Sequence, residues 1–480
     1  MESFMSSISE LLRSPATEIK ELMAKGEISP LEFLEATLEQ LQRLNPVINA
    51  VVTIAENALD EARKLTEHYS KKKSLPLYGL PVGIKDVTPT AGIRTTFGCP
   101  LYADYVPEED ALVVQRIKAA GGIILGKTNT PEFATGGNTF NDVFGVTRNP
   151  WNPRLSAGGS TGGGAAALAT GMIALAEGTD LGGSLRIPAS FCGVVGLRPS
   201  PGLIPTYPSE YLWDNMQVTG PMARSAGDIA LMLQSVAGPS PLSPVCQPTA
   251  GRNFLSAVEA ASLKGKKIAY APDIAGIGVD DEIREICRNA ALELAQVGAQ
   301  VEEMELDLSY GWEPFLFIRG FWMVAQQYQR LDQVEKFGDN LKGNIKSGLQ
   351  VTMEQLGKAE HIRGKMWAQF YEFFQKYDHL ITPCMAIPPF PVEQNYPSTI
   401  AGKPMKTYVD WIAPTFILSL TGLPVGCVPC GLTREKLPVG MQVVGPPRNE
   451  EAVLATMTVM QELFPIGFPS LDTIEAFPVN

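Results

Sequence analysis

Residues 156–171 read "SAGGSTGGGAAALATG", a stretch with six glycines, two serines, two threonines and no charge. Glycine costs a folded chain backbone entropy, so a cluster of glycines indicates a backbone that bends sharply or approaches another group closely. A phosphate-binding loop needs a lysine after its glycines, and a dinucleotide-binding loop needs another glycine spacing, so neither pattern fits. The order G-x-S-x-G matches a serine nucleophile elbow, and a purely structural hinge is a further interpretation.

A nucleophile elbow needs a base, and the sequence has only three histidines, His68, His361 and His379. Each lies in a helical or polar surrounding, where we expect a solvated side chain rather than a catalytic one. The stretch "GLPVGIKD" instead places Lys85 at the end of an apolar strand, where burial disfavours the ammonium form. A neutral lysine is a competent general base, and a Ser-Ser-Lys set can replace Ser-His-Asp. A second Gly-Gly-Ser, ending at Ser184, supplies another hydroxyl.

Four motifs follow one another between residues 79 and 205: "GLPVGIKD", "GKTNTPEF", "SAGGSTGGGAAALATG" and "GTDLGGSLRIPASFCGVVGLRPS". In order, spacing and composition they resemble the amidase signature family. The later "ITPCMAIPPF" and "GLPVGCVPCG…LPVGMQVVG" resemble the C-terminal strands of that family and extend the likeness over most of the chain. The resemblance implies an α/β fold with a large mixed, mostly parallel β-sheet covered by helices on both faces.

The resemblance also implies catalytic roles. Ser184 is expected to be the nucleophile, Lys85 the base, and Ser160 the serine between them, reached through a cis peptide bond after Gly159. Backbone N–H groups are expected to form an oxyanion hole, at Leu181, Gly182, Gly183 and Ser184. Supporting residues are expected to hold the loops, in part through an Asp–Arg pair: Thr161, Thr179, Asp180 and Arg186. The family usually has a serine at the position of Thr161, and threonine keeps the hydroxyl.

The resemblance implies a serine hydrolase that cleaves C–N acyl bonds of small, apolar or aryl amides through an acyl-enzyme, with no metal and no cofactor. A carbamate hydrolase (urethanase) and an esterase use the same triad. A glutamine-hydrolysing subunit of a tRNA-dependent amidotransferase is another alternative, although that branch tends to have glutamine where this chain has Ile187. A non-catalytic binding module that keeps the glycine-rich loops belongs to a different class.

The composition bounds the partners. The 480 residues carry a formal net charge of −12, which argues against nucleic acid and anionic membranes as main partners. No transmembrane segment or leader is recognisable, so we expect a cytoplasmic protein, a monomer or a homodimer. The seven cysteines fit reduced thiols. Cys192 and the pair Cys427 and Cys430 lie in apolar runs and are expected to pack in the core rather than react or bind metal.

The pattern along the chain predicts one α/β/α domain with insertions. Residues 1–70 are expected to be helical, with a helix that starts after Ser29 and stops at Asn45-Pro46. Residues 71–240 form the signature core, 241–310 a βαβ part, and 378–480 strands and a helix that complete the domain. The helical, aromatic-rich insertion 311–377 is expected to form part of the substrate pocket, together with residues near 97–140 and 205–215. Its aromatic residues serve either as core or as a pocket wall.

Overall fold

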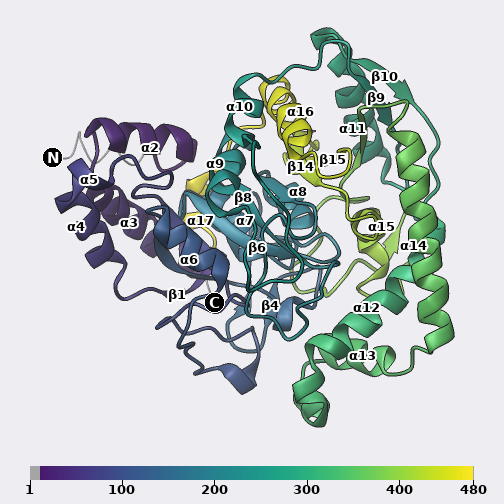
Figure 1. The fold of residues 1–480 in the computed structure, drawn as a ribbon, viewed down its shortest axis with the longest axis horizontal. Coiled ribbons are helices and arrows are strands. Elements are labelled where there is room, and N and C mark those ends of the chain that lie inside the picture. The colour runs from purple at the N-terminus through teal and green to yellow at the C-terminus, as the bar shows by residue number, and fades with distance from the viewer. Residues whose placement is uncertain (1–10, 479–480) are drawn as a thin grey trace.

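The computed structural model describes residues 11–478 and contains an 11-stranded mixed sheet in the order β1-β3-β2-β6-β8-β7-β14-β15-β11-β9-β10 (Figure 1). The sequence prediction of an α/β fold built on a large mixed sheet is confirmed. The strands of the sheet are β1 (Val51–Ile54), β2 (Pro81–Lys85), β3 (Ile123–Thr128), β6 (Leu175–Asp180), β7 (Val195–Arg198), β8 (Val218–Ala223), β9 (Lys267–Tyr270), β10 (Gln300–Glu303), β11 (His379–Pro383), β14 (Val425–Leu432) and β15 (Pro438–Val444).

The prediction that the sheet is mostly parallel is wrong. Four pairings are parallel, β2–β3, β2–β6, β9–β10 and β9–β11. Six are antiparallel, β1–β3, β6–β8, β7–β8, β7–β14, β14–β15 and β11–β15. Parallel neighbours need a crossover, and the predicted βαβ unit has one in helix α11 (Asp281–Glu293). The strands β14 and β15 are joined by only a short loop, 433–437, which requires an antiparallel pair.

Helices cover both faces of the sheet. Helix α8 (Arg186–Cys192) packs on one face, where Gly440 of β15 lies against Ser190. Helix α16 (Glu450–Leu463) packs on the other face, where Gly426 of β14 lies against Met457. The remaining helices are α2 (Ala16–Lys25), α3 (Pro30–Ile48), α4 (Ala58–Glu67), α5 (Tyr69–Lys72), α6 (Leu112–Ala119), α7 (Gly162–Ala169), α9 (Ala226–Val236), α10 (Phe254–Glu259), α12 (Trp312–Gln326), α13 (Asp339–Gly348), α14 (Met353–Phe373), α15 (Ala413–Ser419) and α17 (Leu471–Glu475).

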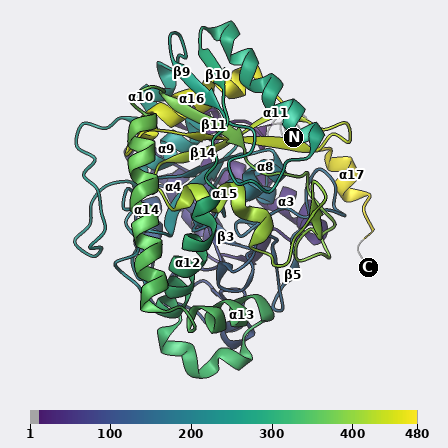
Figure 2. The ribbon, with the colours of Figure 1, turned by 90° about the vertical axis from the view of Figure 1, so that its right-hand side faces the viewer.

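The helical insertion lies at one end of the molecule. In Figure 1 the helices α2–α5 are at one end and α12–α14, in green, are at the opposite end. Figure 2 shows α14 running along the near side, beside α12 and above α13. Helix α12 packs against both α13 and α14 and also against α15, which directly precedes strand β14 in the chain. Helix α12 therefore connects the insertion to the part of the chain that leads into β14.

The first ten residues of the predicted helical region lie outside the described part of the chain. The remainder differs from the prediction in two places, the end of helix α3 and the segment after it. Helix α3 begins after Ser29 with a capping box, as predicted, but it continues through Pro46 to Ile48. The side chain of Asn45 accepts hydrogen bonds from Ala50 N–H (2.8 Å) and Val51 N–H (2.9 Å), which holds the chain as it leaves the helix. The segment that follows is strand β1, because its β-branched residues pair with β3.

Two groups of sequence candidates lie in the core. His379 was expected to be solvated, but it is buried on β11, where Nε2 lies 3.1 Å from the hydroxyl of Thr456. Burial lowers the pKa of His379 to about 4, so the ring is neutral. The cysteines at 192, 427 and 430 are buried and unpaired, as predicted. Burial raises the pKa of the Cys192 thiol, which makes it inert.

Among the described helices, none combines the length and the apolar character needed to cross a bilayer.

Candidate active site

Strand β2 ends at Lys85, and the side chain of this lysine reaches a serine of the glycine-rich loop. Lys85 Nζ lies 2.7 Å from Ser160 Oγ and 3.0 Å from Thr179 Oγ1. Lys85 and Ser160 are fully buried. The peptide bond between Gly159 and Ser160 is cis, as the family resemblance implied. The structure thus brings the expected base and the expected bridging serine into direct contact.

The environment of Lys85 favours the neutral amine. Burial lowers its pKa to about 7, although the carboxylates of Glu177 and Asp180 act in the opposite direction. Glu177 is itself fully buried and accepts hydrogen bonds from Lys85 N–H (3.1 Å) and Thr88 Oγ1 (3.0 Å). A second buried lysine, Lys127, donates to the carbonyl oxygen of Thr88. Sequence reasoning missed Glu177 and Lys127, although each is a charged residue inside an apolar strand, the signal that identified Lys85.

The contacts of Glu177 give a testable prediction. Replacing Glu177 with Gln keeps the hydrogen-bond acceptor but removes a negative charge that favours the protonated form of Lys85. The pKa of Lys85 should fall, so the pH at half-maximal kcat/KM should move down by about one unit. The pH–rate profile measures this shift. The control is Asp86→Asn, which removes a buried carboxylate whose partner is Thr96 and should leave the pH at half-maximal kcat/KM in place. An unchanged pH–rate profile in Glu177→Gln contradicts the prediction.

Ser184 lies on the loop between β6 and α8 and shares a chamber with Ser160. Its carbonyl oxygen accepts a hydrogen bond from Thr161 N–H at 3.2 Å, which ties the two glycine-rich loops together. The hydroxyl of Thr161 lies 3.5 Å from the carbonyl oxygen of Thr179, so the hydroxyl expected at this position has a partner. Within residues 11–478 the Ser184 hydroxyl makes no hydrogen bond, to Ser160 or to any other group. It is therefore free to turn toward a substrate.

The four expected oxyanion-hole donors are not equivalent. Gly183 N–H donates to Asp180 Oδ1 at 2.8 Å, so this group is occupied, and its inclusion among the donors is corrected. The N–H groups of Leu181, Gly182 and Ser184 make no hydrogen bond to a described residue. Leu181, Gly182 and Ser184 also line the chamber that contains Ser160. Three backbone donors without a partner among the described residues thus belong to residues that line the chamber of the two serines.

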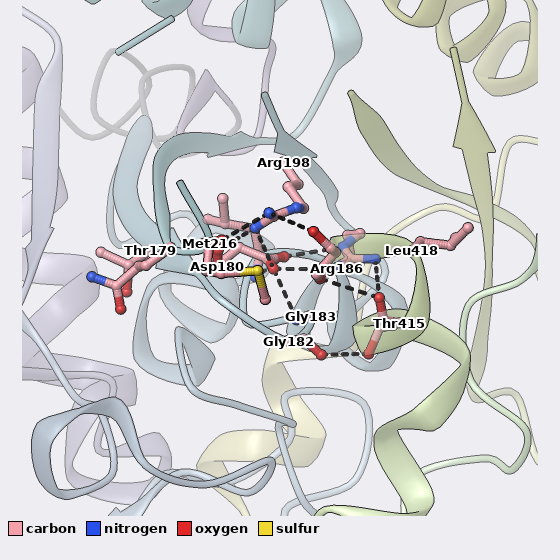
Figure 3. A network of polar contacts seen from close by, with 12 residues as sticks. Thr179, Asp180, Gly182, Gly183, Arg186, Arg198, Met216, Thr415 and Leu418 are labelled. Atoms are coloured by element: carbon pink, nitrogen blue, oxygen red, sulfur yellow. Dashed lines mark hydrogen bonds and ion pairs between the residues drawn. The ribbon is translucent and has the colours of Figure 1, made fainter. Parts of the chain in front are cut away.

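Asp180 holds this loop through a buried ion-pair network (Figure 3). Arg186 Nε lies 3.0 Å from one carboxylate oxygen of Asp180, and another nitrogen of the same guanidinium lies 3.0 Å from the second. Arg198 lies 3.4 Å from the carboxylate and also donates to the carbonyl oxygen of Asp180. Burial raises the pKa of Asp180, but the two guanidinium groups outweigh it and hold the pKa at about 2. The predicted Asp–Arg pair is therefore present, with a second arginine that sequence reasoning missed.

Residues far along the chain complete the support of the loop. Arg186 donates to the carbonyl oxygen of Thr415 (2.8 Å) and to Gln442 Oε1 (2.7 Å). The hydroxyl of Thr415 donates to the carbonyl oxygen of Gly182 at 2.6 Å. Gly183 has a φ of 124°, and a Cβ there would lie 2.3 Å from Thr415 Oγ1, so only glycine fits. Helix α15 and strand β15 thus fix the shape of the loop that carries Ser184.

Two adjoining cavities lead to the serines. The inner chamber, about 30 Å³, contains Ser160 and Ser184 and is lined by Leu181, Phe315, Arg319, Trp322 and Tyr408, among others. The outer cavity, about 410 Å³, is lined by Phe97, Tyr105, Tyr207, Gln326 and Arg330, among others. Phe133, Thr179, Gln217 and Trp322 line both. The three segments that the sequence assigned to a pocket therefore meet around one cavity, and aromatic residues of the insertion form both core and cavity wall.

Two aromatic residues of the outer cavity have unusual backbone conformations. Phe97 and Phe133 have φ values of 55° and 45°, in the left-handed region that bulky residues rarely adopt. Their rings stack with centroids 5.2 Å apart. Arg330 of the 3₁₀ segment Tyr328–Lys336 lies 5.5 Å above the Phe133 ring. The surrounding contacts therefore hold these rings in the cavity wall against their backbone preference.

Comparisons with known proteins agree with this geometry. The sequence model of the family described as Amidase matches residues 32–454. The chain is 36% identical over 459 residues to an acylamidase of Rhodococcus erythropolis, covering 94% of this chain and 95% of that protein. It is 31% identical over 482 residues to one of the subunits of the glutamyl-tRNA(Gln) amidotransferase of Sulfurihydrogenibium sp. (strain YO3AOP1), covering 95% and 98%.

Solved structures give the same result. A bacterial aryl acylamidase of the amidase signature family superposes with a TM-score of 0.89 at 26% identity, covering 97% of this chain and 99% of that one. A 6-aminohexanoate cyclic dimer hydrolase complexed with substrate superposes with a TM-score of 0.85 at 29% identity, covering 96% and 99%. With a family match across most of its length and acylamidases among its relatives, the chain belongs to the amidase signature family and is an amide-hydrolysing enzyme.

Proposed function

We propose that this enzyme hydrolyses the C–N acyl bond of small amides through an acyl-enzyme on Ser184, with Ser160 as proton relay and Lys85 as base. The observation that carries the proposal is the contact between the buried Lys85 amine and the Ser160 hydroxyl at 2.7 Å, in a site that shares a chamber with Ser184. A hydroxyl is both donor and acceptor, so Ser160 can pass a proton between the other two groups.

In the first half of the reaction, Ser184 Oγ attacks the carbonyl carbon of the amide. Its proton moves to Ser160, whose own proton moves to the neutral Lys85 amine. The carbonyl oxygen becomes an oxyanion that the N–H groups of Leu181, Gly182 and Ser184 stabilise. The intermediate collapses, the C–N bond breaks, and the leaving nitrogen takes the proton back from Lys85 through Ser160.

In the second half, water enters after the amine has left. The water oxygen attacks the acyl carbon while its proton follows the same path to Lys85. The bond between the acyl carbon and Ser184 Oγ then breaks, and the proton returns to Oγ. The products are a carboxylic acid and an amine, and the enzyme regains its starting protonation state.

The role of Lys85 predicts the pH dependence of the reaction. Only the neutral amine accepts a proton, and burial places the pKa at about 7. Below that pH the amine is protonated, so kcat/KM should rise about tenfold per pH unit and level off above it. A pH–rate profile measures this. A flat profile, or one with an acid optimum, contradicts the assignment of Lys85 as base.

The cavity supports a bulky, apolar or aryl substrate. Aromatic side chains that line it include Phe97 and Phe133 and, from the insertion, Trp322. Aromatic walls suit an apolar or aryl ligand body, and polar side chains of the same cavity, such as Gln326 and Arg330, can orient it with the carbonyl toward the donors of the inner chamber. We infer that the insertion 311–377 supplies part of the substrate pocket, through helix α12 and the 3₁₀ segment Tyr328–Lys336 that follows it.

A hydrolysis screen tests the proposal and separates its alternatives. Matched anilides, aliphatic amides, carbamates, esters and glutamine are compared by kcat/KM. The proposal expects the highest value for an aryl or apolar amide. A preference for carbamates or esters instead identifies a urethanase or an esterase with the same triad. Hydrolysis of glutamine alone, with dependence on a partner protein, identifies the amidotransferase branch and overturns the proposal.

A further inference from the structure

A tyrosine and an arginine of the inner chamber form a pair that the hydrolytic reaction does not use. Arg319 lies on α12, and Tyr408 precedes the 3₁₀ turn Asp410–Ile412. Both side chains are only 6% exposed, and both line the chamber that contains Ser160 and Ser184. Buried polar groups need partners, so each hydrogen bond of this pair can be counted.

Among residues 11–478, two of the five N–H donors of Arg319 have an acceptor, Asn344 and Tyr408, and the proton of the Tyr408 hydroxyl has none. A guanidinium only donates, so Asn344 must accept through Oδ1 from Arg319 and donate through Nδ2. Asn344 Nδ2 donates to the carbonyl oxygen of Asn340 at 2.6 Å and to Tyr408 Oη at 2.8 Å. Arg319 also donates to Tyr408 Oη. With two donors directed at its oxygen, the Tyr408 hydroxyl must send its proton elsewhere, and no residue within 11–478 accepts it.

The charge of Arg319 also lacks a counterion. Within the described residues Arg319 makes no ion pair. Asp410 uses its carboxylate on Thr407 and on the N–H of Lys406. Asp214 accepts from the indole N–H of Trp322 at 2.6 Å. Arg319 is thus a buried cation with no carboxylate partner, and it contacts the Tyr408 hydroxyl, whose proton has no acceptor. Both features favour an electron-rich oxygen within hydrogen-bond distance of that hydroxyl.

We propose that the Tyr408 hydroxyl, held in place by Arg319 and Asn344, donates a hydrogen bond to a second carbonyl or carboxylate oxygen of the substrate. The substrate class is then an amide with an apolar or aryl body that also carries an oxygen acceptor apart from the scissile carbonyl. This inference rests on the proposed function, because it places the acceptor in the chamber of Ser184. The shared chemistry is an sp² oxygen, and a carboxylate benefits in addition from the charge of Arg319.

Binding to the Ser184→Ala variant tests the proposal without relying on turnover. Two series of anilides serve as probes, and each contains a carboxylate, a carboxamide and an isopropyl compound. In the first series this group is at the end of the acyl chain. In the second it is at the para position of the aniline ring. In one series the carboxylate or carboxamide should bind at least about tenfold more tightly than the isopropyl compound. Adding Tyr408→Phe should bring this preference, the ratio of the two affinities within one variant, to about one. The ratio cancels any loss that all probes share because Arg319 and Asn344 lose an acceptor. Equal preferences with and without Tyr408→Phe, in both series, overturn the proposal.

Kinetics of the otherwise wild-type enzyme add a second readout. Tyr408→Phe should raise the KM for the acceptor-bearing substrate about tenfold more than the KM for the isopropyl substrate. Arg319→Met should weaken binding of the carboxylate probe more than binding of the carboxamide probe. Equal losses of affinity for the two probes assign the site to neutral carbonyl groups. The matched control is Tyr396→Phe, whose hydroxyl donates to the carbonyl oxygen of Lys406 at 3.0 Å. Binding that follows the prediction while no amide is turned over leaves Tyr408 assigned and overturns the proposed hydrolysis alone.

Discussion

Replacing Ser184 with alanine is expected to lower kcat for amide hydrolysis on the order of 10⁴–10⁶-fold. The change removes the atom that forms the acyl-enzyme, and the Ser160 hydroxyl is committed to Lys85 at 2.7 Å. Lys85→Ala should cost a comparable factor, because the relay then has no base. Since the two groups act as one unit, the double variant should be no worse than either single variant. Steady-state hydrolysis of an anilide measures all three.

The matched control is Ser190→Ala. Ser190 is buried on α8, six positions after Ser184, and its hydroxyl accepts a hydrogen bond from Gly440 N–H at 3.1 Å, on the side that faces β15. Activity close to that of the wild type is expected there. Circular dichroism confirms that each variant is folded. More than a tenth of wild-type activity in Ser184→Ala or Lys85→Ala contradicts the triad.

The second large effect is on stability, at Asp180. Asp180→Asn keeps the size of the side chain but leaves Arg186 and Arg198 without their counterion, and the side chains of all three residues are 0% exposed. Removing one partner of a fully buried ion pair typically costs about 3–5 kcal/mol. We expect the free energy of unfolding to fall by that amount. Urea unfolding at neutral pH, with refolding checked, measures it.

The pH dependence of this difference has a defined sign. The carboxyl of Asp180 has a pKa of about 2 in the folded protein, below the value of about 3.9 in an unfolded chain. Its stabilisation is therefore complete above about pH 4 and is lost as the pH falls toward 2. The control is Asp60→Asn, which removes an exposed ion pair with Arg63 and should not move the midpoint of urea unfolding. A loss below about 1 kcal/mol in Asp180→Asn contradicts the role of the network.

Three of the predicted site residues lie at the ends of short, regular elements: Lys85, Asp180 and Arg186. Lys85 was identifiable because a lysine ends an apolar strand bounded by glycines. The structure places it against Ser160, and it places Asp180 against Arg186, six residues away in the sequence. Short-range signals such as these, with the family resemblance, were sufficient for the presence of a large mixed sheet and for the pairing of Asp180 with Arg186, but not for the direction of its strands.

The remaining parts depend on contacts between distant residues. Thr415 lies 229 residues after Arg186, and no local pattern links the two. The occupation of Gly183 N–H by Asp180 is a matter of loop geometry, which composition does not encode. Tyr408 and Arg319 come from separate segments, 89 residues apart, that only the folded chain brings together. The antiparallel centre of the sheet was missed because strand patterns predict burial and not strand direction.

The most direct measurement of the central claim is covalent labelling with a serine-directed fluorophosphonate, followed by mass spectrometry of the digested protein. Attack of an activated serine on phosphorus, with loss of fluoride, leaves a stable adduct on the nucleophile. The account predicts one adduct, on the peptide that contains Ser184, and a large decrease in its rate of formation in Lys85→Ala. An adduct on Ser160, an adduct on another residue, or no adduct on an enzyme that is hydrolysing amide would contradict it.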